Sequence, residues 1–207
     1  MELIERDTLL AALASCFEKA AGGEGHCVLI AGEAGIGKSS VVRAFGERLP
    51  VGSTLYLGLC DALFTPRPLA PVYDVAGQMR GAFWARAMDN PDRGLLFSSF
   101  YQDLAERRGT TVIVFEDIHW ADEATLDLIK FLARRIAQVR CLFVLTYRDN
   151  EVNARHPLRS VLGQLPADVV TRLQPEALSV TAVERLAGGR GYNGEDIYAL
   201  TGGNPFY

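Results

Sequence analysis

The sequence predicts an α/β fold of three layers, with helices on both faces of a mostly parallel sheet of five strands. Short apolar runs without polar alternation recur along the chain, which is typical of strands buried on both faces. Segments with helical periodicity separate these runs, and this alternation is the pattern of a parallel sheet. A length of 207 residues, of which 49% are hydrophobic, suffices for one such core and part of a second unit.

The N-terminal part of the chain supplies the first two strands. We expect a helix between Asp7 as its N-cap and Gly22 as its C-cap. The run HCVLIAG (26–32) predicts the first strand, a helix is expected over 38–49, and STLYLGLC (53–60) predicts the second strand.

The middle of the chain begins with a predicted loop. The stretch TPRPLAP (65–71) contains three prolines, which remove backbone donors and fix φ. Helical pieces are expected around 75–88, and a helix ending in basic residues over 94–108. The run TTVIVFED (110–117) predicts the third strand.

The remaining core elements follow the same alternation. A helix is expected over 123–139, followed by a strand at 141–148, a short helix at 156–165 and a fifth strand at 169–174. The apolar stripe of the first of these helices consists of Leu128, Phe131, Leu132 and Ile136.

The sequence changes character after residue 175. We expect an α/β core over 1–175 and the beginning of a small helical lid over 176–207. Thr181 and Glu184 have the spacing of a capping box, and the paired glycines of LTGGNPFY predict a helix end. Because the chain stops directly after this segment, we expect it to be a fragment of a longer protein.

Charge and composition exclude some classes of function. A net charge of −4 argues against a nucleic-acid-binding face over the whole chain. The four cysteines form no C-x-x-C pair and predict small buried side chains in a reducing compartment. Neither a signal peptide nor an apolar run of about 18 residues is present, so we expect a cytoplasmic protein without membrane partners.

A phosphate-binding motif lies between the first predicted strand and the helix after it. Residues 32–39 spell G-x-x-x-x-G-K-S, in the strand–loop–helix context that this motif requires. Backbone N–H groups of such a loop cradle phosphate oxygens, and the helix N-terminus adds its positive end. Lys38 is expected to reach the β- and γ-phosphates of ATP, and the Ser39 hydroxyl to ligate Mg²⁺. The alternative is a glycine-rich turn with a solvated lysine. The predicted nucleotide-binding residues of this loop are Gly32, Glu33, Ala34, Gly35, Ile36, Gly37, Lys38, Ser39 and Ser40.

Two carboxylates end the third predicted strand. In TVIVFED, Glu116 and Asp117 follow four apolar residues. Acids at this place beside a phosphate loop hold Mg²⁺ and position a water molecule. Glu116 aligns with the metal-side acid and Asp117 with the acid that polarises the attacking water, although the usual order is Asp then Glu. Which of the two binds the metal stays open, as does the alternative of two solvated acids at a strand end.

Four segments together resemble a known family. GEAGIGKSS, VFEDIHWADEATLDLIKFL, LTYRDNE and LTGGNPFY resemble the signal-transduction ATPases with numerous domains (STAND), which are AAA+-related P-loop NTPases. The similarity is greatest to the N-terminal ATPase module of the large LuxR-type transcriptional regulators. The same module is found beside some bacterial adenylate cyclases and protein kinases.

The resemblance implies roles for further residues. Arg6 matches the arginine of an N-terminal GRE signature near the adenine, whereas Glu5 stands where the family has glycine. Arg148 matches a sensor arginine that faces the γ-phosphate, with a surface arginine as the alternative. Pro205 matches a proline near the nucleotide base, or it only follows a helix end. His119 of IHWAD is implied in coupling the site to its surroundings, and a buried His–Trp pair is the alternative.

The resemblance implies a nucleotide-operated switch. Such a module binds ATP with Mg²⁺ between core and lid, hydrolyses it slowly to ADP, and passes the change to C-terminal sensor and effector domains, a DNA-binding helix-turn-helix among them. It also implies a nucleotide-dependent homo-oligomer. Two other functions stay open, a small-molecule kinase and a non-catalytic nucleotide-binding scaffold. Acceptor-independent phosphate release would separate the switch from both.

Overall fold

A five-stranded parallel sheet forms the centre of the protein. The computed structural model describes residues 3–63, 65, 67–89, 92–188 and 193–207. The strand order is β2–β3–β4–β1–β5, and all four neighbouring pairs are parallel, which confirms the predicted fold class. The strands are β1 (His26–Ala31), β2 (Thr54–Leu59), β3 (Thr111–Glu116), β4 (Cys141–Tyr147) and β5 (Val170–Leu173).

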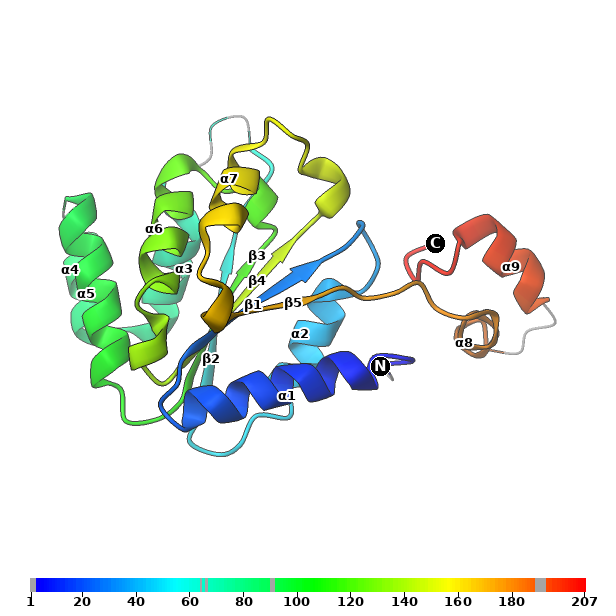
Figure 1. Ribbon diagram of the computed structural model, residues 1–207, viewed down its shortest axis with the longest axis horizontal. Coiled ribbons are helices and arrows are strands. Elements are labelled where there is room, and N and C mark those ends of the chain that lie inside the picture. The colour runs from blue at the N-terminus through cyan, green and yellow to red at the C-terminus, as the bar shows by residue number, and fades with distance from the viewer. Residues whose placement is uncertain (1–2, 64, 66, 90–91, 189–192) are drawn as a thin grey trace.

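Helices cover both faces of this sheet (Figure 1). One face carries α1 (Asp7–Ala21) and α2 (Lys38–Gly46). The other face carries α3 (Ala70–Met79), α4 (Gly81–Met88), α5 (Arg93–Glu106), α6 (Glu123–Ala133) and α7 (Pro157–Gln164). The last two helices, α8 (Val180–Leu186) and α9 (Gly194–Thr201), lie beside the sheet and contact each other.

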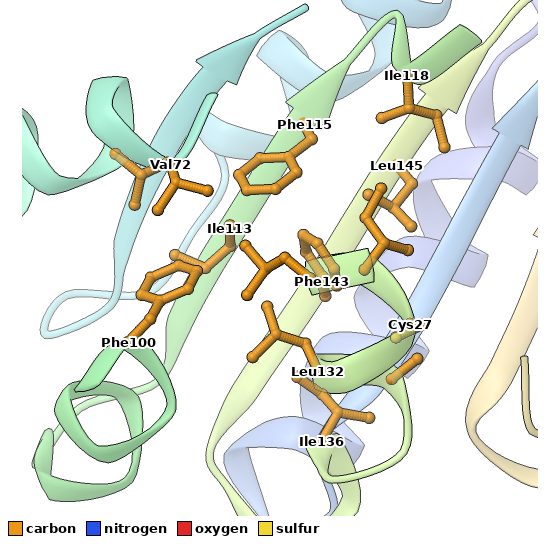
Figure 2. Close-up of a cluster of buried hydrophobic side chains, with 14 of the residues drawn as sticks. Cys27, Val72, Phe100, Ile113, Phe115, Ile118, Leu132, Ile136, Phe143 and Leu145 are labelled. Carbon is orange, nitrogen blue, oxygen red and sulfur yellow. The ribbon is translucent and has the colours of Figure 1, made fainter. Parts of the chain in front are cut away.

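Alternate residues of the central strands point to opposite faces. Ile113, Phe115 and Phe143 lie under α3, α5 and α6 (Figure 2), and the rings of Phe115 and Phe143 meet edge to face at 5.1 Å. Their chain neighbours Val114 and Val144 pack with α1 and α2 instead. Both sets are fully buried, which is why the strand sequences are continuously apolar.

Two helix predictions need correction. The helix expected over 123–139 ends at Ala133, and Ile136 begins the separate 3₁₀ helix η2 (Ile136–Gln138). The break brings the Ile136 carbonyl so close to Gly25 that a Cβ at Gly25 would lie 2.0 Å from that oxygen. The helical region around 75–88 consists of two helices, because Arg80 has a φ of 54° and ends α3 there.

The predicted proline loop is shorter than expected. Helix α3 starts at Ala70, so Pro71 lies in its first turn, where a missing N–H is tolerated. Pro66 lies outside the described residues.

The helix caps agree with the sequence at some ends only. Gly22 is the C-cap of α1 as predicted, but the N-cap is Arg6, and Asp7 lies in the first turn, where its charge favours the helix dipole. The capping box predicted at Thr181 and Glu184 is wrong. Helix α8 is capped by Ser179, whose hydroxyl accepts the Ala182 N–H at 3.1 Å.

The last two helices have a small apolar cluster of their own. Leu178 and Val183 are buried there against Ile197 of α9 and against Ile4 from the N-terminal segment. The N-terminal residues therefore contact both the core and the segment after β5. Among the described residues, no helix has the length and apolarity needed to cross a membrane.

Candidate functional site

The loop between β1 and α2 has the conformation of a phosphate-binding loop. Gly32, Gly35 and Gly37 have φ angles of 154°, 78° and 102°, a region that residues with a side chain rarely adopt. Helix α2 begins at Lys38, so its N-terminal N–H groups open onto this loop. The glycines of the motif are therefore explained by backbone geometry.

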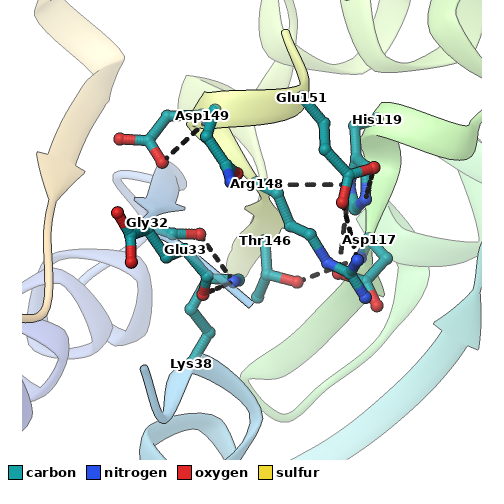
Figure 3. Close-up of polar contacts among 10 residues, drawn as sticks. Gly32, Glu33, Lys38, Asp117, His119, Thr146, Arg148, Asp149 and Glu151 are labelled. Atoms are coloured by element: carbon teal, nitrogen blue, oxygen red, sulfur yellow. Dashed lines mark hydrogen bonds and ion pairs between the residues drawn. The ribbon is translucent and has the colours of Figure 1, made fainter. Parts of the chain in front are cut away.

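Lys38 is folded back across the loop (Figure 3). Its Nζ donates hydrogen bonds to the Gly32 carbonyl at 2.7 Å and to the Glu33 carbonyl at 2.8 Å. The residue is only 6% exposed, and this burial lowers the pKa of its ammonium, with Asp117 as the main opposing charge. The solvated lysine considered as an alternative does not describe this side chain.

Arg6 is a buried side chain that bonds to the backbone of this loop. It is 4% exposed, and its Nη2 donates to the Ile36 carbonyl at 3.1 Å. Its Nη1 donates to the Glu5 carbonyl at 2.9 Å, and burial lowers the pKa of the guanidinium. Arg6 thus joins the N-terminal segment to the phosphate loop.

Glu116 and Ser39 lie together, although their strands are not neighbours. Strand β4 separates β1 from β3 in the sheet, yet the Ser39 side chain lies close enough to the Glu116 carboxyl to lower its pKa. Burial raises the pKa of this carboxyl, and the Ser39 side chain opposes the shift. A hydroxyl and a carboxylate side by side are oxygen ligands that suit Mg²⁺.

The described residues contain no cluster of three or more His, Cys, Asp and Glu side chains that could hold a metal ion. Mg²⁺ beside a nucleotide usually has one or two protein ligands, with phosphates and water completing the shell. The donor set of Ser39 and Glu116 therefore fits a Mg²⁺–nucleotide complex.

Asp117 has a backbone conformation that is uncommon outside glycine. Its φ and ψ are 54° and 44°, and its N–H donates to the Thr146 hydroxyl of β4 at 3.0 Å. This turn leads directly into the 3₁₀ helix η1 (Ile118–Trp120). Such strained residues persist where the surrounding structure holds them, and they cluster at functional sites.

A cavity of about 350 Å³ opens in front of the phosphate loop. It brings together three predicted groups, namely the loop, Asp117 after β3 and Arg148 after β4, and adds the C-terminal segment. Its lining consists of Ala34, Gly35, Gly37, Lys38, Ser39, Ser40, Asp117, Arg148, Pro205 and Phe206. Three other predicted residues of the loop, Gly32, Glu33 and Ile36, line a neighbouring cavity with Pro175 and Gly202.

Arg148 lines this cavity but is paired with a carboxylate. Its Nη1 donates to Glu151 Oε1 at 2.6 Å, and its Cζ lies 4.5 Å from the centre of the Trp120 ring. Trp120 in turn packs on the buried His119, with ring centres 4.5 Å apart. The predicted His–Trp pair is therefore a real contact, and it lies directly beside Arg148.

The C-terminal segment lies on the tip of the phosphate loop. The buried Asn204 donates from Nδ2 to the Ala34 carbonyl at 2.9 Å, and its Oδ1 accepts the Phe206 N–H at 3.1 Å. A Cβ at Gly35 would lie 2.3 Å from the Cβ of Phe206. Sequence reasoning missed Asn204, although it lies within the GGNP element, and it also missed Thr146 and Glu151.

A family model described as an AAA ATPase domain matches residues 2–145. The chain belongs to the AAA ATPase domain family. This AAA ATPase domain is 30% identical over 222 residues to the uncharacterized protein R02095 of Rhizobium meliloti (strain 1021). The match covers 84% of the chain but only 22% of that protein.

Solved structures of several AAA+ proteins share the fold. The domain superposes on Drosophila ORC bound to DNA with a TM-score of 0.64 and 17% identity, covering 99% of this chain and 53% of the other. Cdc6p from Pyrobaculum aerophilum superposes with a TM-score of 0.63 and 17% identity, covering 90% of this chain and 49% of the other. A STAND protein with a tetratricopeptide repeat sensor from Pyrococcus horikoshii superposes with a TM-score of 0.58 and 16% identity, covering 98% of this chain and 28% of the other. These likenesses establish the fold, and with the family match they identify a nucleotide-binding AAA+ ATPase domain.

Proposed function

We propose that this AAA ATPase domain is a switch that binds ATP with Mg²⁺, hydrolyses it slowly and reports the bound nucleotide through the position of its last two helices. The core would consist of residues 1–175, and residues 176–207 would begin the lid. The observation that carries this proposal is the hydrogen bond from Asn204 to the Ala34 carbonyl. Because Ala34 belongs to the loop that would hold the phosphates, a change in that loop would reach the lid through this bond and through Phe206, which lies against Gly35.

The chemistry would be divided among four side chains. Lys38 binds the β- and γ-phosphates, and Ser39 and Glu116 hold the metal ion. When bound, Mg²⁺ neutralises charge on the phosphates as the terminal bond breaks. Asp117 lines the cavity and orients the attacking water, which is the role expected for an acid beside the metal ligand.

Adenine would lie on the side of the loop that faces the N-terminal segment. Arg6 supports this assignment only indirectly, since it holds the Ile36 carbonyl and so fixes the loop. Pro205 borders the cavity at the loop tip, so we propose that it bounds the nucleotide on its lid side.

The switch would work within a larger signalling protein. Two observations support this: the chain spans 22% of the R. meliloti protein, and a fold relative is described as a STAND protein with a repeat sensor. We therefore propose C-terminal sensor and effector domains, with a DNA-binding domain that regulates transcription as one effector. Nucleotide-dependent self-assembly would accompany the switch, as the resemblance to STAND ATPases implies.

Phosphate release with and without acceptor molecules tests the proposal. We expect slow, Mg²⁺-dependent release from ATP in the absence of any acceptor. Consumption of ATP that depends on an added acceptor would instead indicate a kinase, and binding without turnover would indicate a scaffold.

Amide hydrogen exchange tests the switch itself. Exchange in α8 and α9 should differ between the complexes with ADP and with a slowly hydrolysed ATP analogue. The variant Asn204→Ala should reduce this difference while retaining nucleotide binding. The variant Gln164→Ala, on the exposed end of α7, serves as the matched control. An identical response in the Asn204 variant and the wild type would contradict the assigned link.

A further inference from the structure

The carboxylate of Glu151 lies between the side chains of Arg148 and His119. Its Oε1 accepts a hydrogen bond from Arg148 Nη1 at 2.6 Å, and its Oε2 lies 3.4 Å from His119 Nε2 (Figure 3). The hydrogen bond from Arg148 lowers the pKa of this carboxyl, and the nearby His119 adds to the shift. One oxygen of this exposed glutamate therefore bonds to a guanidinium, and the other lies beside an imidazole nitrogen.

The tautomer of His119 follows from its other contact. The Arg148 backbone N–H donates to His119 Nδ1 at 3.4 Å, so a neutral ring carries its proton on Nε2. This Nε2 is buried and has no hydrogen-bond partner within the described residues, although the Glu151 oxygen is its nearest charged neighbour. A side chain that is 1% exposed thus keeps a ring nitrogen without a hydrogen-bond partner 3.4 Å from the carboxylate.

Glu151 and the side chains around it lie in different kinds of structure. His119 and Trp120 lie on η1, directly after the acids of β3, and Arg148 directly follows β4. These positions are fixed by the central sheet. Glu151 lies on the exposed 3₁₀ helix η3 (Asp149–Glu151), and its side chain is 38% exposed. The acceptor can therefore leave more easily than the donors can.

The Arg148 side chain of this pair also borders the cavity in front of the phosphate loop. Arg148 lines that cavity together with Lys38 and Asp117. A guanidinium flanked by N–H donors binds a phosphoryl oxygen by the same charge-assisted hydrogen bonds with which it binds a carboxylate. Glu151 and a terminal phosphate would consequently compete for one side chain.

We propose that Glu151 is an internal substitute for the γ-phosphate, and that it holds Arg148 on the His119–Trp120 side of the cavity until ATP displaces it. This inference rests on the proposed ATP-binding function and assigns Glu151 as a positioning residue for that same site. Binding of ATP has to break the pair between Glu151 and Arg148, and this costs free energy. Binding of ADP, which has no γ-phosphate, leaves the pair intact. Glu151 thereby reduces the preference of the site for ATP over ADP and delays the switch until ATP is abundant.

Binding measurements on a variant cycle test the proposal. Dissociation constants for ADP and for a slowly hydrolysed ATP analogue, both with Mg²⁺, would be measured for wild type, Glu151→Gln, Arg148→Ala and the double variant. We expect Glu151→Gln to bind the analogue about two- to fivefold more tightly, as for a partly exposed ion pair, with ADP unchanged. The effect should vanish when Arg148 is absent. Glu18→Gln, on the exposed side of α1, is the matched control.

Tryptophan fluorescence gives a second readout. The chain has two tryptophans, so Trp84→Phe leaves Trp120, which contacts Arg148, as the only one. The ATP analogue should change its emission and ADP should not. Adding Glu151→Gln should shift the emission toward the analogue-bound value before any nucleotide is added.

Several outcomes would overturn the inference. They are weaker analogue binding by Glu151→Gln, an equal change for both nucleotides, or a change that persists without Arg148. Because the analogue is not turned over, an absence of phosphate release by the wild type would contradict the proposed hydrolysis and leave this test intact. Failure of the wild type to bind either nucleotide would refute both proposals.

Discussion

Glu5 has the backbone conformation that glycine usually provides. Its φ is 56°, at the position where the STAND-type signature has glycine. The side chain that glycine lacks makes new contacts here, because its two oxygens accept hydrogen bonds from the N–H and the hydroxyl of Ser179. Ser179 is the N-cap of α8. A departure from the family pattern has thus become a link between the N-terminal segment and α8.

Lys38 should account for a large part of the affinity for ATP. Replacing it with alanine removes the ammonium that the Gly32 and Glu33 carbonyls hold across the loop. We expect Lys38→Ala to weaken ATP binding at least tenfold, since a charge-assisted hydrogen bond contributes about 1.5–3 kcal/mol. Isothermal titration calorimetry measures the change.

Lys130 offers a control for this substitution. Its Nζ lies 2.8 Å from Asp127 Oδ1 on the outer side of α6, in an ordinary surface pair. Lys130→Ala should leave the affinity for ATP unchanged. Equal affinity of wild type and Lys38→Ala would refute the assignment of the phosphate loop.

Glu116 and Asp117 should differ in what their amide variants lose. Glu116 contacts Ser39, so Glu116→Gln should mainly weaken the Mg²⁺ dependence of ATP binding. Asp117 lines the cavity, so Asp117→Asn should keep ATP binding and lose about 10²–10⁴-fold in turnover, as expected when a general base is removed. Phosphate release and affinity with and without Mg²⁺ separate the two. Unchanged turnover in Asp117→Asn would move the water-positioning role to Glu116.

At the scale of the elements, the sequence predicted the strands better than the helix ends. Burial on both faces makes β3 and β4 continuously apolar, and such runs are visible without tertiary information. The end of α6 at Ala133 depends on the close approach of Gly25 to Ile136, which are far apart in sequence. The break at Arg80 likewise was not predicted, because arginine rarely adopts a positive φ and the exposed Arg80 has one here.

Gly58 allows α3 to pack directly on β2. A Cβ at this residue would lie 2.3 Å from the Pro71 carbonyl oxygen and 2.7 Å from the Pro71 Cα. Both are backbone atoms, so they cannot move without shifting the helix. We expect Gly58→Ala to lower the free energy of unfolding by about 1–3 kcal/mol, measured by urea denaturation.

The matched control is Gly163→Ala in α7. A Cβ there meets no atom within 4 Å, and its position within a helix favours alanine. This variant should raise the free energy of unfolding by about 0.5–1 kcal/mol. A Gly58→Ala protein as stable as the wild type would show that α3 is not tightly seated on the sheet.

At the scale of the whole molecule, strand order assembles the site. Periodicity predicted five strands but not that β4 lies between β1 and β3. This order places Thr146 and Arg148 between the phosphate loop and the acids, which no sequence spacing reveals. The motifs and the family resemblance predicted roles for Lys38, Glu116 and Arg148 because the sequence signals for these residues are local. Asn204 and Glu151 were missed because their partners lie in other segments.

The link between Glu5 and Ser179 should make the attachment of α8 to the N-terminal segment depend on pH. The hydrogen bonds from Ser179 lower the pKa of Glu5 below its ordinary value of 4.5. The contribution is therefore fully present above pH 4.5 and is lost as the pH falls through the lowered pKa. At pH 7, amide exchange in α8, relative to intrinsic rates, should be faster in Glu5→Gln than in the wild type or in Glu24→Gln. The difference should disappear well below pH 4.5, while β1 and β4 stay protected. Equal exchange at pH 7, or a difference that persists in acid, would mean that other contacts hold α8 in place.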